Sequence, residues 1–424
     1  MPSSRPITRS RNNPTRRTNP TRRGFLALAS ALAVTVTGLT GIGPAHAAEP
    51  VIIGELNSYT RLPAFTEPYR HGWQLALDEI NAQGGVLGGR QIQVVSRDDG
   101  GTPADAQRVA SELVKAHDAV LIAGTFFSHV GLAVADYAAR QQIPFLAAEP
   151  LTDAIVWEKG NPYTFRLRPS TYMQAQMLAE EAAKLPATRW VTVAPNYEYG
   201  RSAVENFKAA LKERRPDVEF VGEQWPALGK IEAGVTVQAL LRSRPDAIYN
   251  VTFGADLAKF VREGSLRGLF DDRHVVSLLT GEPEYLLPLD DEAPEGWIVT
   301  GYPFDQIDTL AHTAFATAYE AQVGEAPKLG SIVGYATMKS IAAALDKAGS
   351  TEPEALAAAF RDLAVDTPFG PIVYRGSDHQ STLGAYVGRT GRIDGRPAMI
   401  DWRYADGADY LPGGDEAAAR RPGN

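Results

Sequence analysis

Short β-branched segments alternate with longer segments of helical periodicity after about residue 50, and this alternation constrains the fold more than any other feature. Val51 to Leu56 is typical of a strand, and Tyr69 to Gln83 places Trp73, Ala76 and Ile80 on one face of a helix. Strands that alternate with helices pair in parallel through right-handed crossovers. The pattern therefore predicts an α/β fold with a doubly wound sheet.

The same alternation begins again after about residue 170, with a helix expected at Thr171 to Lys184. Enough elements follow for a second doubly wound sheet, and no long polar linker separates the two series. After Gly301 the sequence becomes mainly helical, and it ends in antiparallel strands such as Ala398 to Tyr404. Two lobes joined by short crossings, with a cleft between them, are the expected organisation.

The N-terminal segment has the composition of an export signal. Met1 to Ala48 contains seven arginines and no acidic residue, and Arg22 and Arg23 directly precede an apolar stretch. Ala45 to Ala47 supplies small residues at the two positions that a signal peptidase reads. The paired arginines indicate the twin-arginine pathway, so we expect residues 1–47 to be removed. The alternative is a membrane anchor, but the glycine-interrupted stretch is short of the ~20 strongly apolar residues that a spanning helix needs.

Charge and cysteine content narrow the function classes. The whole chain carries −8 and the leader carries +7, which leaves about −15 on the mature protein. An acidic surface disfavours binding to nucleic acid or to anionic lipid. The chain has no cysteine, which excludes a disulfide framework, a thiolate metal site and a lipid-modified N-terminal cysteine. The mature protein is therefore expected to be free in solution.

Several segments, in order, resemble the type I periplasmic binding proteins, and in particular the leucine/isoleucine/valine-binding family of ATP-driven importers. The segments that carry the resemblance are Gly72 to Gly89, Ser96 to Val114, Asn196 to Gly200, Ala247 to Arg262 and Thr367 to Pro371. The similarity extends from Val51 to about Tyr404. No single motif decides it; the ordered set does.

The resemblance implies two lobes joined by three crossing strands that close over a ligand like a hinge. The crossings would fall near Pro169, Pro303 and Gly370. The N-terminal lobe would then comprise 48–168 and 303–370, and the C-terminal lobe 169–302 and 371–411, followed by a frayed polar tail at 412–424. The implied protein is a periplasmic monomer that delivers its ligand to the membrane permease of an ABC importer, without cofactor or metal.

The first lobe offers ligand-binding candidates in the loops that follow its strands, where backbone donors are free. Ser128 lies where the family places a hydroxyl that binds the ligand carboxylate, although an ordinary helix cap is the alternative role. Glu149 and Leu151 belong to the family's second carboxylate-binding segment. Here the sequence departs from the family, because Pro150 has no N–H to donate. This departure disfavours an α-amino acid held in the usual way.

The second lobe offers Tyr199, Phe253 and Glu282. The resemblance places Tyr199 and Phe253 at aromatic positions of the cleft and Glu282 near an acidic residue that pairs with a ligand ammonium. Core packing for the aromatic residues and a solvated turn for Glu282 are the alternatives. Tyr59 and Phe127, in loops of the first lobe, would add to an apolar half of the pocket. Branched-chain or related amino acids and small aromatic acids both suit such a site.

Two other function classes compete with a binding protein. An exported enzyme is disfavoured because the chain lacks a G-x-S-x-G elbow, an H-E-x-x-H motif, a P-loop and a G-x-G-x-x-G motif after a strand. Asp378 to Ser381 contains the letters of a catalytic triad, but we interpret it as a solvated turn. A ligand sensor on the same fold, acting on a regulatory partner instead of a permease, remains open.

Overall fold

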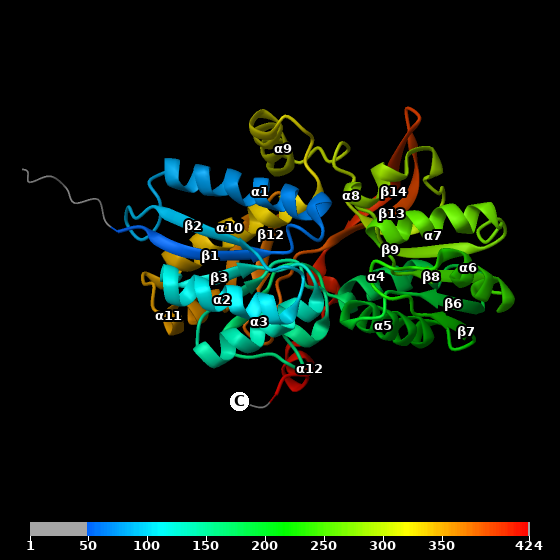
Figure 1. Ribbon diagram of the computed structural model, residues 1–424, viewed down its shortest axis with the longest axis horizontal. Coiled ribbons are helices and arrows are strands. Elements are labelled where there is room, and N and C mark those ends of the chain that lie inside the picture. The colour runs from blue at the N-terminus through cyan, green and yellow to red at the C-terminus, as the bar shows by residue number, and fades with distance from the viewer. Residues whose placement is uncertain (1–48, 423–424) are drawn as a thin grey trace, which may run out of the picture. The chain divides into compact units, whose positions relative to one another are not determined.

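The computed structural model describes residues 49–422, so the predicted export signal and its cleavage site lie outside the described residues. The described chain builds two large sheets with helices on both faces, as Figure 1 shows. We call the part built on each sheet the first lobe and the second lobe. This is the predicted fold class, and the two strand–helix series of the sequence correspond to the two sheets.

The first sheet has five parallel strands in the order β2-β1-β3-β4-β5. The strands are β1 (Val51–Asn57), β2 (Ile92–Asp98), β3 (Leu121–Gly124), β4 (Phe145–Ala147) and β5 (Thr164–Arg166). The crossover helices are α1 (Pro63–Ala82), α2 (Pro103–His117) and α3 (Ser128–Gln141). Burial on both faces explains why β3 and β4 are continuous apolar runs rather than alternating ones.

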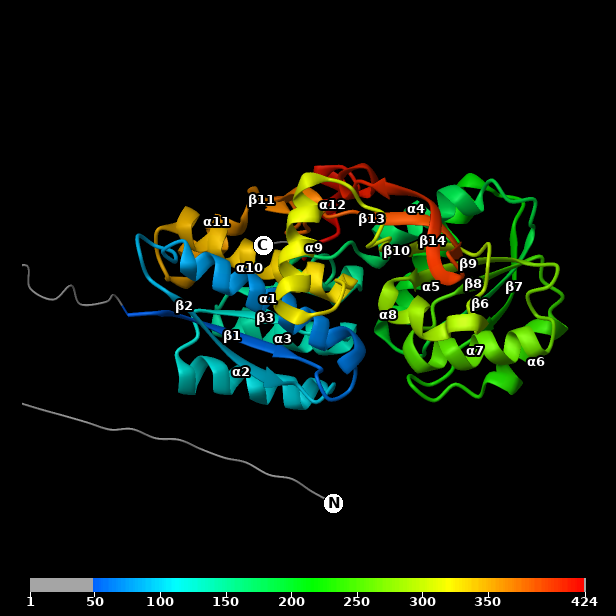
Figure 2. The ribbon, with the colours of Figure 1, turned by 90° about the horizontal axis from the view of Figure 1, so that it is seen from above.

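Later segments of the chain complete the first lobe. They are α9 (Leu310–Val323), α10 (Leu329–Ala348), α11 (Pro353–Phe360) and the antiparallel pair β11 (Leu363–Thr367) and β12 (Gly370–Tyr374). The yellow-orange helix α10 lies beside the blue α1 in both Figure 1 and Figure 2, and the orange α11 packs against α10. Helices α1 and α10 approach closely because Gly72 and Gly334 face the opposite backbone. A Cβ on Gly334 would lie 2.0 Å from the carbonyl oxygen of Tyr69.

The second sheet has seven strands in the order β14-β13-β10-β9-β8-β6-β7, and only the β10–β13 and β13–β14 pairs are antiparallel. Its strands are β6 (Arg189–Val193), β7 (Glu219–Gln224), β8 (Ala247–Asn250), β9 (His274–Gly281), β10 (Ile298–Gly301), β13 (Ala385–Ile393) and β14 (Arg396–Ala405). Its helices are α4 (Thr171–Ala182), α5 (Glu198–Arg214), α6 (Ala233–Arg242), α7 (Gly254–Leu266) and α8 (Pro283–Leu286). Short 3-10 turns occupy Asp153–Ile155, Leu287–Glu292 and Gly407–Tyr410.

The chain passes between the sheets after β5, after β10 and before β13. The first two passages lie at Pro169 and Pro303, where the sequence places them. The third lies later than Gly370, because residues 378–381 still pair with the first lobe: Arg166 forms a parallel bridge with Gln380. We therefore place the third crossing at residues 382–384, and assign 371–381 to the first lobe. These lobe limits remain our proposal.

The segment Asp378 to Ser381 is buried rather than a solvated turn. Its residues extend the edge of the first sheet beside β5, and the Asp378 carboxylate accepts a hydrogen bond from the Trp157 indole N–H at 3.0 Å. Burial lowers the pKa of His379 to about 3, so its imidazole is neutral. These residues therefore form contacts between distant segments of the chain. Composition and turn propensity do not reveal such contacts.

The C-terminal segment up to Pro422 is folded rather than frayed. It forms α12 (Gly414–Ala419), buries Ala417 and returns to the first lobe. The guanidinium carbon of Arg420 lies 4.5 Å from the ring centroid of Trp157 and 5.0 Å from that of Tyr172. Arg421 donates a hydrogen bond to the Asn161 carbonyl. The two arginines near the end of the tail therefore contact aromatic rings and a backbone carbonyl.

Helix α1 also begins earlier than its sequence indicates. The helix is predicted from Tyr69, but the chain is helical from Pro63 onward. Pro63 occupies the first helical position, which tolerates the missing N–H, and Pro68 is accommodated inside the helix. Phe65 therefore lies in α1 and not in a loop. Among residues 49–422, no helix is both long and apolar enough for a membrane crossing.

Candidate ligand-binding cleft

A pocket lies where strand ends of the two sheets face each other, and we call it the ligand cavity. Its lining comes from both lobes. The lining residues are Phe126, Ser128, Glu149, Leu151, Arg168, Tyr197, Tyr199, Phe253 and Leu279.

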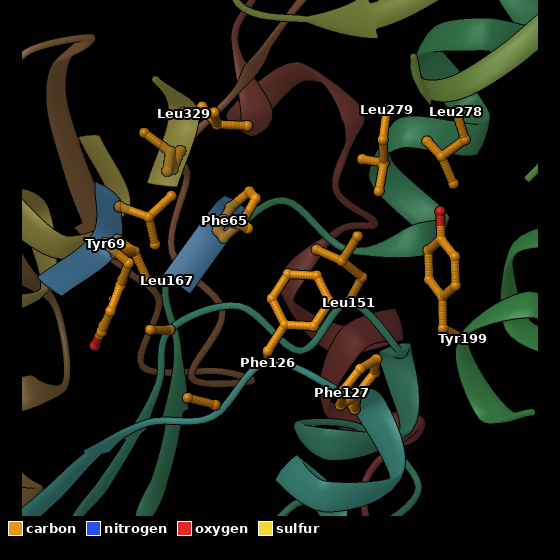
Figure 3. Packing of buried hydrophobic residues seen from close by; sticks show 14 of the residues in the cluster. Phe65, Tyr69, Phe126, Phe127, Leu151, Leu167, Tyr199, Leu278, Leu279 and Leu329 are labelled. Atoms are coloured by element: carbon orange, nitrogen blue, oxygen red, sulfur yellow. The ribbon is translucent and has the colours of Figure 1, made fainter. Parts of the chain in front are cut away.

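The elements explain why these residues meet. Carboxyl ends of parallel strands lie at one edge of a sheet, and the loops that leave them carry the lining residues. Ser128 follows β3 and Leu151 follows β4, whereas Tyr199 follows β6 and Phe253 follows β8. In Figure 3, Phe126 and Leu151 lie on one side, and Tyr199 and Leu279 on the other. Loops that the sequence analysis singled out in both lobes therefore meet at this cavity.

Aromatic rings from the two lobes contact each other across this region. The ring centroids of Phe126 and Phe253 are 6.2 Å apart, and those of Tyr199 and Phe253 are 5.8 Å apart. Phe127 does not line the cavity; it packs edge-on against Phe126 at 5.1 Å and against Tyr197 at 6.2 Å. These rings provide the apolar half of the cleft, with contact geometries that aromatic pairs prefer.

Ser128 is the first residue of α3 and not its cap. The N-cap position belongs to Phe127, which makes no side-chain capping bond. The buried Ser128 hydroxyl accepts a hydrogen bond from the Thr152 N–H at 3.3 Å, so its own proton remains available to a ligand. The first-turn N–H groups of a helix have no acceptor within the helix, and they favour an anion. Ser128 and the start of α3 can therefore receive a carboxylate.

The fully buried Arg166 forms hydrogen bonds with the loop that carries Glu149 and Leu151. Its guanidinium donates to the carbonyl oxygen of Leu151 at 3.2 Å and to that of Thr152. Thr152 in turn donates its hydroxyl proton to Glu198 Oε1 of the second lobe at 2.7 Å. Pro150 has no backbone N–H, so this loop has fewer hydrogen-bond donors of its own. The hydrogen bonds from the Arg166 guanidinium to the loop carbonyls fix its position instead.

Glu149 and Glu282 share one arginine, Arg168, and the three form a buried triad. Arg168 Nη1 donates to Glu149 Oε2 at 3.2 Å, and Arg168 Nη2 donates to Glu282 Oε1 at 2.5 Å. All three side chains are less than 5% exposed. Burial raises the pKa of both carboxyl groups, that of Glu282 to about 8, although Arg168 opposes the rise.

The two acids face different spaces. Glu149 lines the ligand cavity, whereas Glu282 lines a second space of about 300 Å³ beside the passages, which we call the passage cavity. Pro169, Gly301 and Leu383, one from each passage, also line the passage cavity. The second carboxylate oxygens, Glu149 Oε1 and Glu282 Oε2, are buried and have no hydrogen-bond partner among the described residues.

Sequence reasoning missed Arg168, which lines the ligand cavity together with Tyr197 and Leu279, which it also missed. A buried carboxylate needs a cationic partner, and the sequence argument assigned that role to a ligand. The available signal was an arginine directly before Pro169, at a predicted crossing between two lobes with acidic cleft residues. Tyr59 was placed in the cleft but does not line it: its ring lies under Arg70, with 3.8 Å between guanidinium carbon and ring centroid.

Leu279 reaches the cavity through a local irregularity in β9. Its φ is 68°, in the left-handed region that a branched residue seldom adopts, and the β9–β10 register shifts close by. Within the described part of the chain, no three His, Asp or Glu side chains are placed to hold a metal ion. The arrangement can bind a small amphiphilic ligand, with an anion site at α3, an acceptor at Glu149 and aromatic walls.

The comparisons with known proteins agree with this geometry. Residues 53–395 match the model of a family described as periplasmic binding protein. The chain belongs to the periplasmic binding proteins. Within them it is a type I member of the leucine/isoleucine/valine-binding family, as its resemblance predicted. A "Leu/Ile/Val-binding protein homolog 7" of Brucella suis is 25% identical over 74% of this chain and 82% of its own.

Further relatives carry related names. An "Amino acid binding protein" of Pseudomonas aeruginosa is 26% identical over 82% of this chain and 90% of its own. A solute-binding protein of Rhodopseudomonas palustris BisB5, solved with 3,4-dihydroxybenzoic acid, has a TM-score of 0.76 and 22% identity over 84% of this chain and 98% of that one. A leucine-, isoleucine-, valine-, threonine- and alanine-binding protein of Brucella ovis has a TM-score of 0.75 and 22% identity over 86% and 97%. These structures establish that the periplasmic binding protein fold is shared.

Proposed function

We propose that this periplasmic binding protein is exported to the periplasm and captures an α-amino acid with an apolar side chain for an ABC importer. The observation that carries the ligand class is the unpartnered, buried Oε1 of Glu149, a residue that lines the ligand cavity. A buried carboxylate oxygen without a donor favours a ligand that brings one, and an ammonium group brings three. The relatives named as amino-acid-binding proteins support the same class.

The remaining groups suit the other parts of such a ligand. The carboxylate would lie at the start of α3, against the Ser128 hydroxyl, and the side chain among Phe126, Tyr199 and Phe253. This assignment differs from the sequence-based one in a single respect: Glu149 takes the ammonium, and Glu282 acts through Arg168. Pro150 is compatible with it, because the carboxylate would depend on α3 rather than on the loop that contains Pro150.

A small aromatic acid is the second candidate. The aromatic walls favour it, and relatives of similar fold are solved with 3,4-dihydroxybenzoic acid and 4-hydroxybenzoate. Such a ligand has no cation for Glu149, so the pair of acids would have to retain a proton when the cleft closes over it.

Calorimetry on residues 48–424 separates the candidates. L-leucine and L-phenylalanine should bind, whereas isocaproate and hydrocinnamate, which lack only the amine, should bind about ten- to a hundredfold more weakly, since a charged hydrogen bond is lost. The bound amino acid should stabilise the native state by ~2.7 kcal/mol at a hundredfold excess over Kd. It should also reduce the radius of gyration in solution scattering. Tighter binding of hydroxybenzoates than of either amino acid would contradict the proposal.

The transport role has its own test. A deletion strain should lose uptake of the bound amino acid while keeping normal transcriptional responses to it. The reverse result would support a sensor that acts on a regulatory partner. We expect the protein to work as a monomer with the permease as its partner.

A further inference from the structure

Arg168 lies where the chain leaves the first lobe for the second. It follows β5 and directly precedes Pro169. Its side chain is 4% exposed. Its carbonyl oxygen accepts a hydrogen bond from Gln380 Nε2 at 3.0 Å, and Gln380 belongs to the segment before the third passage. Two of the connections between the lobes thus fix the backbone of this one residue.

The guanidinium of Arg168 joins acids that come from different lobes. Glu149 follows β4 of the first sheet, and Glu282 follows β9 of the second. Each is bonded through one oxygen, at 3.2 Å and 2.5 Å. Phe65 of α1 covers the group, with 5.6 Å from the guanidinium carbon to the ring centroid. Arg168 is also the lining residue that the ligand cavity and the passage cavity have in common.

The fork of the guanidinium matters as much as its charge. The N–H donors of the guanidinium point in fixed directions, so Arg168 binds one oxygen of each carboxylate. Because the carboxylate is planar, this bond also fixes where its second oxygen points. A lysine ammonium carries the same charge but cannot hold two acids on opposite sides with defined angles. For Glu149, the oxygen whose direction is set is Oε1, which is buried and unpartnered among residues 49–422.

We propose that Arg168 is a positioning residue that selects ligands with an ammonium group: anchored by Glu282 of the second lobe, it aims Glu149 Oε1 into the ligand cavity. The inference rests on the proposed function, because the selected group is the ammonium of the amino acid. When both acids are ionised, two carboxylates and one guanidinium leave one excess negative charge, which one ligand cation neutralises. Closure of the second lobe and recognition of the ammonium therefore depend on the same side chain.

The test compares Arg168→Lys, which keeps the charge and removes the fork, with Arg273→Lys as the control. Arg273 is half-buried, donates to the carbonyl oxygens of Pro245, Gly268 and Leu269, and contacts neither acid. Calorimetry would use L-leucine with isocaproate and L-phenylalanine with hydrocinnamate. Arg168→Lys should weaken amino-acid binding about tenfold or more and deaminated-acid binding less than about threefold. Arg273→Lys should leave the ratio of the two affinities unchanged.

Equal loss of both affinities in Arg168→Lys would overturn the proposal, since a merely structural arginine predicts that result. Unchanged affinities would overturn it as well. Arg168→Met in a Glu149→Gln/Glu282→Gln background provides a ligand-free measurement by urea unfolding. Arg168→Met should destabilise the wild type but not the double variant, in which neither acid carries a charge. Equal destabilisation of both proteins would show that Arg168 does not link the two acids. If the wild type binds neither amino acid, the proposed function is wrong, and so is the proposed selection of ligands by Arg168. The urea-unfolding comparison still shows whether Arg168 links the two acids.

Discussion

At the scale of single residues, the cleft contains three polar groups with different chemistry. They are an anion site at Ser128, an acceptor at Glu149, and a cation at Arg168 that the two acids share. Each polar group has a partner that fixes it, namely the Thr152 N–H for Ser128 and the guanidinium for both acids. Polar groups that are held in this way lose little freedom when a ligand binds. The cleft is therefore organised before the ligand arrives.

Ser128→Ala should weaken amino-acid binding by about 1.5–3 kcal/mol, the range for a hydrogen bond to a charged group. The folded state should also lose stability, because the buried Thr152 N–H is left without its acceptor. Calorimetry and urea unfolding measure the two effects. Ser340→Ala is the control: this buried serine of α10 donates to the Ala336 carbonyl far from the cleft, so only stability should change. Equal affinity in Ser128→Ala and the wild type would place the carboxylate elsewhere.

The pH dependence of ligand preference reports on the triad. Burial raises the pKa of Glu282 to about 8, with Glu284 adding to the rise and Arg168 opposing it, and Glu149 is shifted in the same direction. With a ligand that lacks an amine, the pair of acids retains a proton below about pH 8. A ligand ammonium favours the ionised form, so that complex holds one proton fewer. The complex with fewer protons gains as pH rises.

The ratio of the affinity for L-phenylalanine to that for hydrocinnamate should therefore increase between pH 6 and 8, by up to about tenfold per unit, and level off above. Calorimetry at several pH values measures this ratio. Glu149→Gln should flatten the profile, because the acid that faces the ligand no longer titrates. A flat profile in the wild type would mean that the ammonium does not reach the triad.

At the scale of elements, the first lobe depends on the contact between α1 and α10. Gly72 and Gly334 allow the two backbones to touch: a Cβ on Gly72 would lie 2.0 Å from the Ser331 carbonyl oxygen. Such a contact cannot relax by moving a side chain, since backbone lies on the other side. The close packing keeps Phe65, on α1, next to Phe126 and the guanidinium of Arg168.

Gly334→Ala should destabilise the protein by about 1–3 kcal/mol, although alanine favours an isolated helix by ~1 kcal/mol over glycine. The reason is the clash of the new Cβ with the Tyr69 carbonyl oxygen. Urea unfolding measures the change. Gly413→Ala is the matched control, because a Cβ at this position would have no atom within 4 Å and the φ of −54° is ordinary. A stabilised Gly334→Ala would show that the helices separate readily.

At the scale of the whole molecule, we expect the predicted leader to direct the binding protein to the periplasm. Arg22 and Arg23 before an apolar stretch, and small residues at Ala45 and Ala47, predict export by the twin-arginine route. Mass spectrometry of the periplasmic protein should find Ala48 or Glu49 at the N-terminus. Replacing Arg22 and Arg23 by lysine should leave the precursor in the cytoplasm, which fractionation would detect. Normal export of that double variant would remove the pathway assignment and leave secretion intact.

Local sequence determined the elements and the loops that carry the site. Strand and helix periods are set by neighbours along the chain, so β1, β8 and β9 could be predicted, and so could the loops of Ser128, Glu149 and Phe253 that follow strand ends. The periodic signal weakened where tertiary contacts override local preference. Pro68 inside α1 and the buried segment Asp378 to Ser381 are the examples.

Tertiary structure alone decided which polar groups share a partner. Glu149 and Glu282 are 133 positions apart in the sequence, and nothing in the neighbourhood of either one names Arg168 as its counterion. The pairing arises because the ends of β4 and β9 meet at the first passage, where desolvation makes an unpaired charge costly. The same burial removed Tyr59 from the cleft and ordered the tail at α12. Side-chain partnership depends on distance in space and on exclusion of water, and a linear pattern encodes neither.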